Sequence, residues 1–386
     1  DLLVLPPSFP YGGMENPRLT FATPTVIVGD KSLVSLVAHE LAHSWSGNLV
    51  TFATDKDAWL NEGFTSYVEN RLVEALFGKE QADMEAAIGR AEVVEEYKTL
   101  DPKLQRLALE PGDLADPDNS SSATVYQKGA WFLSFLEQRF GREVFDAWLK
   151  GYFDRHAFQS MTTARLVEDL QQNLLATNPG KVTDAEIQEW VYGAGIPATA
   201  PKVESRRFIT VDAARIAWTG SGMLPTQSIT GAWSTQEWVR FLEGMPDALK
   251  PEQLRQLDEA YTLTGTPNGE IAQRWYPLAE RSGYTEARAE MGMFLERVGR
   301  RKLIMPTYKA LVETDGGLAF AQHVFAKAKP GYHPITIGSV QAVIDEAAAK
   351  SAATPAGPGK PSAGQTATAP ESLHPSDPVP MPVETR

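Results

Sequence analysis

Apolar side chains recur every three or four residues along most of this chain, a period typical of amphipathic helices. In the first half, the pattern predicts helices at 32–46, 58–77, 80–97, 125–140, 142–154, 162–175 and 183–193. Residues 1–30 differ, because turn residues and short apolar runs favour extended segments, including a strand at 25–28. Glycine and proline then cluster between 193 and 201, which indicates a boundary.

The second half of the chain is also predicted to be helical. Amphipathic segments lie at 233–243, 251–260, 268–282, 284–298, 301–313 and 316–328. Their short connections favour antiparallel helix pairs stacked as in an α-solenoid. Residues 351–386 contain eight prolines and no aromatic residue, so this tail is expected to be disordered. We therefore expect an α+β, mostly α chain, with units at 1–197, 198–210 (a linker), 211–349 and 350–386 (the tail).

Residues 39–43 read His-Glu-Leu-Ala-His, and a glutamate follows at position 62. On a helix, His39 and His43 are one turn apart on the same face, so both imidazoles can reach one metal ion. Glu62 would supply a third protein ligand from a neighbouring helix and leave a fourth position open for water and substrate. Glu40 lies beside the histidines, free to take a proton from an activated water. This spacing predicts a zinc peptidase.

The segment that carries this motif predicts a helix with one buried apolar face. The residues of that face are Leu33, Val34, Val37, Ala38, Leu41, Ala42 and Trp45. Gly47 and Asn48 are expected to stop the helix. In the next predicted helix, Glu69 follows Glu62 by two turns on the same face. It could hydrogen-bond a ligand imidazole from behind the metal; the alternative is a solvated helix carboxylate.

Composition and charge exclude several classes of binding partner. The net charge is −13, the pI is near 5.1 and Lys and Arg form no long block, which argues against nucleic acid or an anionic membrane. No apolar run is long enough for a membrane span. Cysteine is absent, which excludes disulfides and thiolate chemistry. The chain begins without Met or a basic leader, so we expect a fragment that lacks upstream sequence.

A glycine pair precedes the metal motif in the run Tyr11-Gly12-Gly13-Met14-Glu15. Taken alone, the run predicts a turn that leads into a strand, with Glu15 as a surface carboxylate. The functional interpretation is that Glu15 neutralises a substrate ammonium group, while the two glycines let a peptide backbone approach closely.

These motifs resemble the gluzincin aminopeptidases, and within them the leukotriene A-4 hydrolase and aminopeptidase B branch. The resemblance is carried by residues 10–17 (PYGGMENP), 37–45 (VAHELAHSW), 59–63 (WLNEG), 125–129 (VYQKG), 298–302 (VGRRK) and 331–334 (GYHP). It extends from residue 1 to about 338 and is looser in the helical C-terminal part. It implies a thermolysin-like zinc peptidase domain at 1–197, lacking its N-terminal part, followed by a solenoid-like α-helical domain.

The resemblance also implies roles for individual residues. His39, His43 and Glu62 match the zinc ligands, and Glu40 matches the general base. In the substrate cleft, Glu15 matches the carboxylate that binds the free α-amino group, beside Tyr11, Gly12, Gly13 and Met14.

Three further positions complete the implied site. Tyr126 matches the tyrosine whose hydroxyl stabilises the oxyanion, although by itself it would be interpreted as a hydrogen-bonded core residue. Arg300 and Lys302 match the pair that receives the C-terminal carboxylate of short peptides. Their alternative interpretation is a solvated basic turn.

Two positions bear on a different activity. Ser121 stands where the leukotriene hydrolases have a second tyrosine, and Asp118 matches the carboxylate of their epoxide chemistry. We therefore expect a zinc aminopeptidase, with one Zn²⁺ per chain, that acts on short peptides. The alternatives are a leukotriene-type epoxide hydrolase in the same cleft, or a helical scaffold with a structural zinc. A structural zinc usually has four protein ligands, whereas only three are identified here. Protein partners are unknown, and the cytoplasm is the expected compartment.

Overall fold

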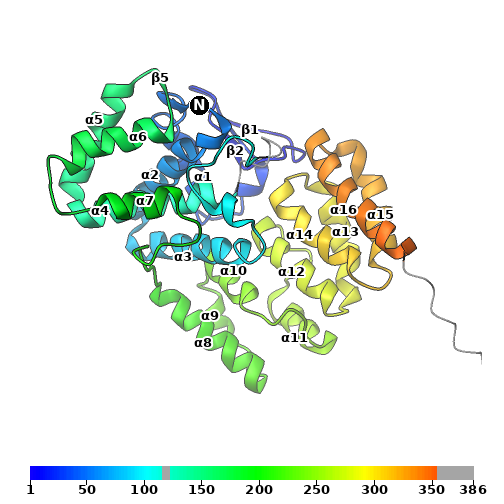
Figure 1. Cartoon of the computed structure of the whole chain (residues 1–386). Helices are drawn as coiled ribbons and strands as arrows, with labels where there is room; N and C mark the ends of the chain where they lie inside the picture. The colour runs from blue at the N-terminus through cyan, green and yellow to red at the C-terminus, as the bar shows by residue number, and fades with distance from the viewer. Residues whose placement is uncertain (115–121, 354–386) are drawn as a thin grey trace, which may run out of the picture.

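The computed structural model describes residues 1–114 and 122–353, so Asp118, Ser121 and most of the predicted tail lie outside the described residues. Helices gather in two bodies (Figure 1). The N-terminal body, residues 1–200, lies at the left of the view, and the C-terminal body, residues 206–353, lies below it and at the right. Among the described helices, none has both the length and the apolarity to cross a membrane.

In the described part of the N-terminal body, five short strands form two small sheets. In the first sheet, β1 (Leu2–Val4) runs parallel to β3 (Thr20–Ala22), which pairs antiparallel with β2 (Gly13–Met14), so the order is β1-β3-β2. In the second, β4 (Val50–Phe52) runs parallel to β5 (Gln159–Met161).

The predicted strand at 25–28 is wrong. A 3-10 turn at Pro24–Val26 occupies that place, and the Thr23 side chain caps it by accepting a hydrogen bond from the Thr25 amide. Proline fixes its own φ and lacks an amide proton, so it starts a turn more readily than it joins a ladder.

The helices predicted for the N-terminal body are all present. They are α1 (Ser35–Ala42), α2 (Trp59–Phe77), α3 (Lys79–Glu96), α4 (Gly129–Phe140), α5 (Arg142–His156), α6 (Thr163–Leu170) and α7 (Asp184–Tyr192). Two π-helical turns adjoin them, η5 (Thr124–Lys128) before α4 and η6 (Gln171–Leu175) after α6. The core between these helices is largely aromatic, with Trp59, Phe64, Phe132 and Trp190 fully buried.

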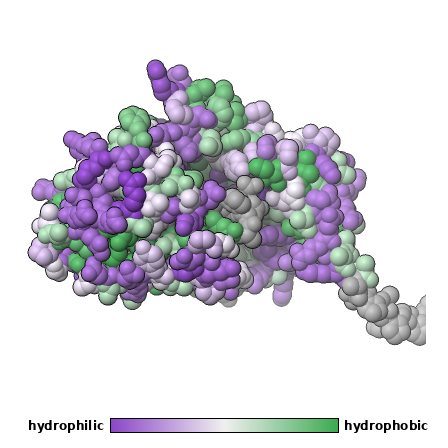
Figure 2. All heavy atoms as spheres, turned by 45° about the horizontal axis from the view of Figure 1, so that its top comes forward, coloured by the Kyte–Doolittle hydropathy of each residue, from purple (hydrophilic) through white to green (hydrophobic). Residues whose placement is uncertain are grey.

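The first helix departs from prediction in length and in orientation. Instead of spanning 32–46, α1 ends at Ala42, and the following residues form turns up to Gly47, whose φ of +134° suits glycine. Its expected apolar face is partly in solvent, because Val37, Leu41 and Trp45 are 38%, 54% and 45% exposed. Apolar patches interrupt an otherwise polar surface in Figure 2. Glu40 and His43 point inward beside Ala42, so the helical period is confirmed but only part of the predicted apolar face is buried.

The C-terminal body consists of stacked helices. They are α8 (Arg206–Ser221), α9 (Gln227–Thr230), α10 (Thr235–Glu243), α11 (Pro251–Tyr261), α12 (Gly269–Arg281), α13 (Arg288–Arg297), α14 (Arg301–Val312), α15 (Gly317–Ala328) and α16 (Pro334–Ala353). The sequence did not predict α8, α9 or α16. Helix α8 begins inside the stretch expected as a linker, and α16 continues past residue 349.

Backbone hydrogen bonds join the two bodies near the first sheet. The Gly299 amide donates to the Pro7 carbonyl at 2.8 Å, and the Arg301 amide donates to the Pro10 carbonyl at 3.1 Å. A methyl group on Gly299 would lie 2.8 Å from the Ser8 Cα, so glycine permits this approach. The turn before α14 is thereby held against the segment that leads into β2.

A second close approach joins α2 to the start of α4. A methyl group on Gly129 would lie 2.8 Å from the Gly63 Cα, and one on Gly63 would lie equally close to the Gly129 Cα. Backbone therefore packs directly on backbone here, beside Glu62 on one helix and beside the π-helical turn on the other.

We expect Gly63→Ala to destabilise the protein by about 1–3 kcal/mol, since the added methyl overpacks an interface of two backbones. Thermal melting would measure the loss. The control is Gly338→Ala on the exposed side of α16, where an added methyl meets no atom within 4 Å. That change should stabilise the helix slightly, by up to about 1 kcal/mol. Equal melting temperatures for both variants would contradict the interpretation.

Candidate active site

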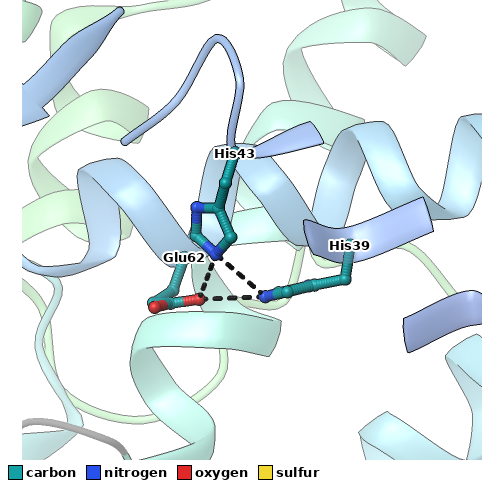
Figure 3. Close-up of side chains that lie close together, drawn as sticks. All are labelled: His39, His43 and Glu62. Carbon is teal, nitrogen blue, oxygen red and sulfur yellow. Dashed lines mark hydrogen bonds and ion pairs between the residues drawn. The ribbon is translucent and has the colours of Figure 1, made fainter. Parts of the chain in front are cut away.

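Three ligand atoms converge where α1 faces α2 (Figure 3). The Nε2 atoms of His39 and His43 are 3.2 Å apart, and Glu62 Oε2 lies 3.2 Å from the first and 3.5 Å from the second. The predicted trio is thus brought together, with His39 in the last turn of α1, His43 directly after that helix and the carboxylate from the first turn of α2.

Hydrogen bonds behind the rings determine which nitrogens carry protons. His43 Nδ1 lies 2.7 Å from the Ser46 carbonyl oxygen, which can only accept, so Nδ1 is the protonated nitrogen of the neutral ring. His39 Nδ1 likewise lies 2.9 Å from Glu69 Oε2. Each Nε2 therefore presents a lone pair to the other and to the Glu62 carboxylate. Three acceptors that face one another need a cation between them, and two imidazoles with one carboxylate fit zinc.

The electrostatics of the trio agree with this geometry. Burial acts to lower the pKa of His39, but hydrogen bonds and charges from Glu62 and Glu69 outweigh it and raise the pKa well above its usual value. Burial acts to raise the pKa of Glu62, but the two histidines lower it to about 2. The group as a whole therefore favours positive charge at its centre.

Glu40 occupies the position expected of a base. Its side chain is only 6% exposed, and its carboxylate lies against Gly13, where an added methyl group would overlap it. Burial raises the pKa of Glu40 to about 7, against the opposing effect of His39 and His43. Carboxylate oxygens of Glu15 and Glu40 lie within 4.8 Å of each other and of a His43 ring nitrogen.

Tyr126 reaches the same group from the π-helical turn η5. Its ring stacks on that of His39, with centroids 6.0 Å apart and planes inclined by 26°. Burial and the nearby charges of Glu62, Glu40 and Glu15 raise the pKa of Tyr126 well above its usual value, so the phenol keeps its proton. Its hydroxyl hydrogen-bonds the Glu62 carboxylate, so the phenol acts as a donor within this group.

The segment from Tyr11 to Glu15 lies beside this group. Gly13 and Met14 form β2, at one edge of the first sheet, and Tyr11 and Met14 are both exposed. The Glu15 carbonyl accepts a hydrogen bond from the Asn48 side chain at 2.9 Å, which ties β2 to the turns after α1.

The basic pair comes from the C-terminal body, and Arg300 is not a solvated turn residue. Arg300 is buried; Nη1 lies 3.3 Å from Thr25 Oγ1, and a methyl group on Gly12 would lie 2.9 Å from Nη2. Its Nε has no hydrogen-bond partner among the described residues. Lys302 is half-exposed, with Nζ 3.3 Å from a carboxylate oxygen of Glu92.

Several groups that support these side chains carry no signal in the sequence. Glu270 on α12 faces Arg274, Arg300 and Lys302, whose charges hold its pKa at about 2 although burial acts to raise it. Ser46 and Thr65, which orient His43, were also missed, because their contacts depend on how α1 turns back toward α2.

Comparison with known proteins places both bodies in described families. Residues 1–190 match the family described as Peptidase family M1 domain, and residues 233–344 match Leukotriene A4 hydrolase, C-terminal. Leucine aminopeptidase 2 of Yarrowia lipolytica is 36% identical over 357 residues, which are 87% of this chain and 54% of that protein. Aminopeptidase B of Mus musculus is 34% identical over 367 residues, or 89% of this chain and 55% of that protein.

The fold is similar to that of a solved structure as well. The yeast LTA4 hydrolase in complex with bestatin has a TM-score of 0.80 and 29% sequence identity, covering 89% of this chain and 59% of that one. The chain thus spans about half the length of the curated relatives it matches.

We expect Glu69→Ala to weaken zinc binding about 10- to 100-fold, because His39 would lose the acceptor that fixes its tautomer and ring orientation. Competition with a chromophoric chelator would measure the dissociation constant. Glu74→Ala is the control: this residue is on the same helix but pairs with Arg142. Wild-type affinity in both variants would contradict the role assigned to Glu69.

Proposed function

This chain belongs to the M1 family of peptidases, and from that premise we propose that it is a zinc-dependent aminopeptidase, which hydrolyses the bond after the N-terminal residue of a peptide. The observation that carries the proposal is the convergence of two imidazole lone pairs and one carboxylate beside the buried Glu40. His39, His43 and Glu62 would hold one Zn²⁺ per chain. Zinc, when bound, polarises a carbonyl oxygen and lowers the pKa of a water molecule.

Among the described residues, His39, His43 and Glu62 form the group around the two Nε2 atoms. The neighbouring carboxylate, that of Glu40, lies against Gly13. A catalytic zinc typically has three protein ligands, whereas a structural zinc has four. The ligand set therefore favours an enzyme over a helical scaffold.

Proton transfer is assigned to Glu40. Its carboxylate accepts the proton of the attacking water and delivers that proton to the amine that leaves, so the peptide bond is broken without net gain or loss of protons. The Tyr126 hydroxyl donates a hydrogen bond to the oxygen that becomes negatively charged during attack. Such donors stabilise the transition state more than the substrate.

Recognition of a free amino terminus is assigned to Glu15. A peptide can extend β2 by backbone pairing, because β2 is an edge strand in the order β1-β3-β2. The ammonium group of the bound peptide would then lie beside the Glu15 carboxylate, close to Glu40. Arg300 and Lys302 extend the cleft on the side of Gly12 and suit the carboxylate at the other end of a short peptide.

The first test is hydrolysis itself. We expect a panel of fluorogenic aminoacyl substrates to be cleaved in a reaction that a chelator abolishes and added zinc restores. Glu40→Gln should lower kcat at least about a thousandfold and leave zinc content unchanged, because it removes the base but no ligand. Glu85→Gln, a half-buried carboxylate on α3 outside the group, should keep activity. Full activity in Glu40→Gln would refute the assigned base.

The second test concerns the amino terminus. We expect Glu15→Gln to lower kcat/KM about 10- to 100-fold, the range for loss of one hydrogen bond to a charged group. Wild type should reject the same substrates once their amino group is acetylated. Glu80→Gln, on an exposed part of α3, serves as the control. Equal turnover of free and acetylated substrates by wild type would contradict the role of Glu15.

A further inference from the structure

We propose that Lys128 is a positioning residue for Tyr126, because its ammonium group anchors the π-helical turn on which the Tyr126 phenol stands. This inference rests on the proposed function, in which that phenol stabilises the oxyanion. Lys128 ends η5 (Thr124–Lys128), two residues after Tyr126, and directly precedes α4.

Lys128 is an unusual residue to find in this place. Its side chain is 0% exposed, and Nζ donates to the Gln105 carbonyl at 2.8 Å and to the Gly193 carbonyl at 2.7 Å. Both partners are neutral carbonyls. Among the described residues no carboxylate pairs with Nζ, so the buried ammonium is unfavourable. Burial lowers the pKa of Lys128 to about 8, against the opposing charge of Glu189. An apolar side chain of similar length would fill the space without that penalty, so packing alone does not explain a lysine.

The two carbonyls belong to segments that are distant in the sequence. Gln105 ends a 3-10 helix at Pro102–Gln105, and Gly193 is the residue after α7, at the negative end of that helix dipole. Lys128 therefore ties the π-helical turn to two separate parts of the N-terminal body at once.

Other contacts hold the turn on its remaining sides. The Gln127 amide fills the space above Gly89 on α3, where a methyl group would collide with it, and Gly129 packs on Gly63. The Thr124 hydroxyl donates to Tyr97 Oη at 3.1 Å. A π-helical turn is less favourable than a regular helix, and such turns persist at functional sites where their surroundings hold them.

The consequence for Tyr126 is geometric. Its ring stacks on His39, which places the phenol at the ligand group. Displacement of a catalytic group by about 1 Å can reduce the rate about a hundredfold. Without the hydrogen bonds from Lys128 to the two carbonyls, the turn could relax toward a regular helix. Tyr126 would then rotate away from His39.

A double-mutant cycle on zinc-loaded protein tests this. Tyr126→Phe should lower kcat about 100- to 1000-fold. Lys128→Met should lower kcat about tenfold in the wild-type background but less than twofold in the Tyr126→Phe background, because the group it positions is already gone. KM and zinc content should stay within about twofold of wild type. Asp169→Asn is the control: it weakens the ion pair between the buried Asp169 carboxylate and the exposed Arg155 of α5, and should leave kcat unchanged in both backgrounds.

Equal loss of kcat in both backgrounds, or no loss in either, would overturn the inference. If Lys128→Met does not fold, Lys128→Gln in the same cycle decides, since it keeps one donor without the charge. Failure of the proposed function would appear elsewhere, as wild-type protein without chelator-sensitive hydrolysis. The two failures are therefore distinguishable.

Discussion

The candidate site depends on one electrostatic constraint. The Nε2 atoms of His39 and His43 and the Glu62 Oε2 atom, all hydrogen-bond acceptors, lie 3.2–3.5 Å from one another. Two imidazole nitrogens and a carboxylate repel each other unless positive charge lies between them. Hydrogen bonds behind the rings maintain this state, because Glu69 and the Ser46 carbonyl fix the protons of His39 and His43 on their outer nitrogens.

Other parts of the N-terminal body hold His39, His43 and Glu62 in position. Helix α1 presents polar side chains inward, and Glu40 is among its few buried residues. Glycines allow the neighbouring segments to approach: Gly13 lies against Glu40, and Gly63 and Gly129 pack backbone on backbone. Side chains at these positions would push Glu40, Glu62 or the Tyr126 turn outward. Because these glycines have no side chain, they determine how closely the neighbouring segments approach.

The C-terminal body reaches the segment before β2 by backbone contacts. Hydrogen bonds from the amides of Gly299 and Arg301 to Pro7 and Pro10 bring the buried Arg300 beside Gly12. Glu270 balances that charge from α12. Arg300 and Gly12 lie almost three hundred residues apart in the chain, so only these contacts between the two bodies bring them together.

The sequence by itself determined most of the helices and the pairing of His39 with His43, because both features are local: a period of 3.6 residues defines a helix, and a spacing of four puts two histidines on one face. It could not show which face of α1 is inside, because the same period describes a stripe facing the core or the solvent. Nor could it show α8 and α16, or the carbonyls that hold Lys128. Those features depend on contacts between residues tens to hundreds of positions apart, and only the tertiary structure decides which of them meet.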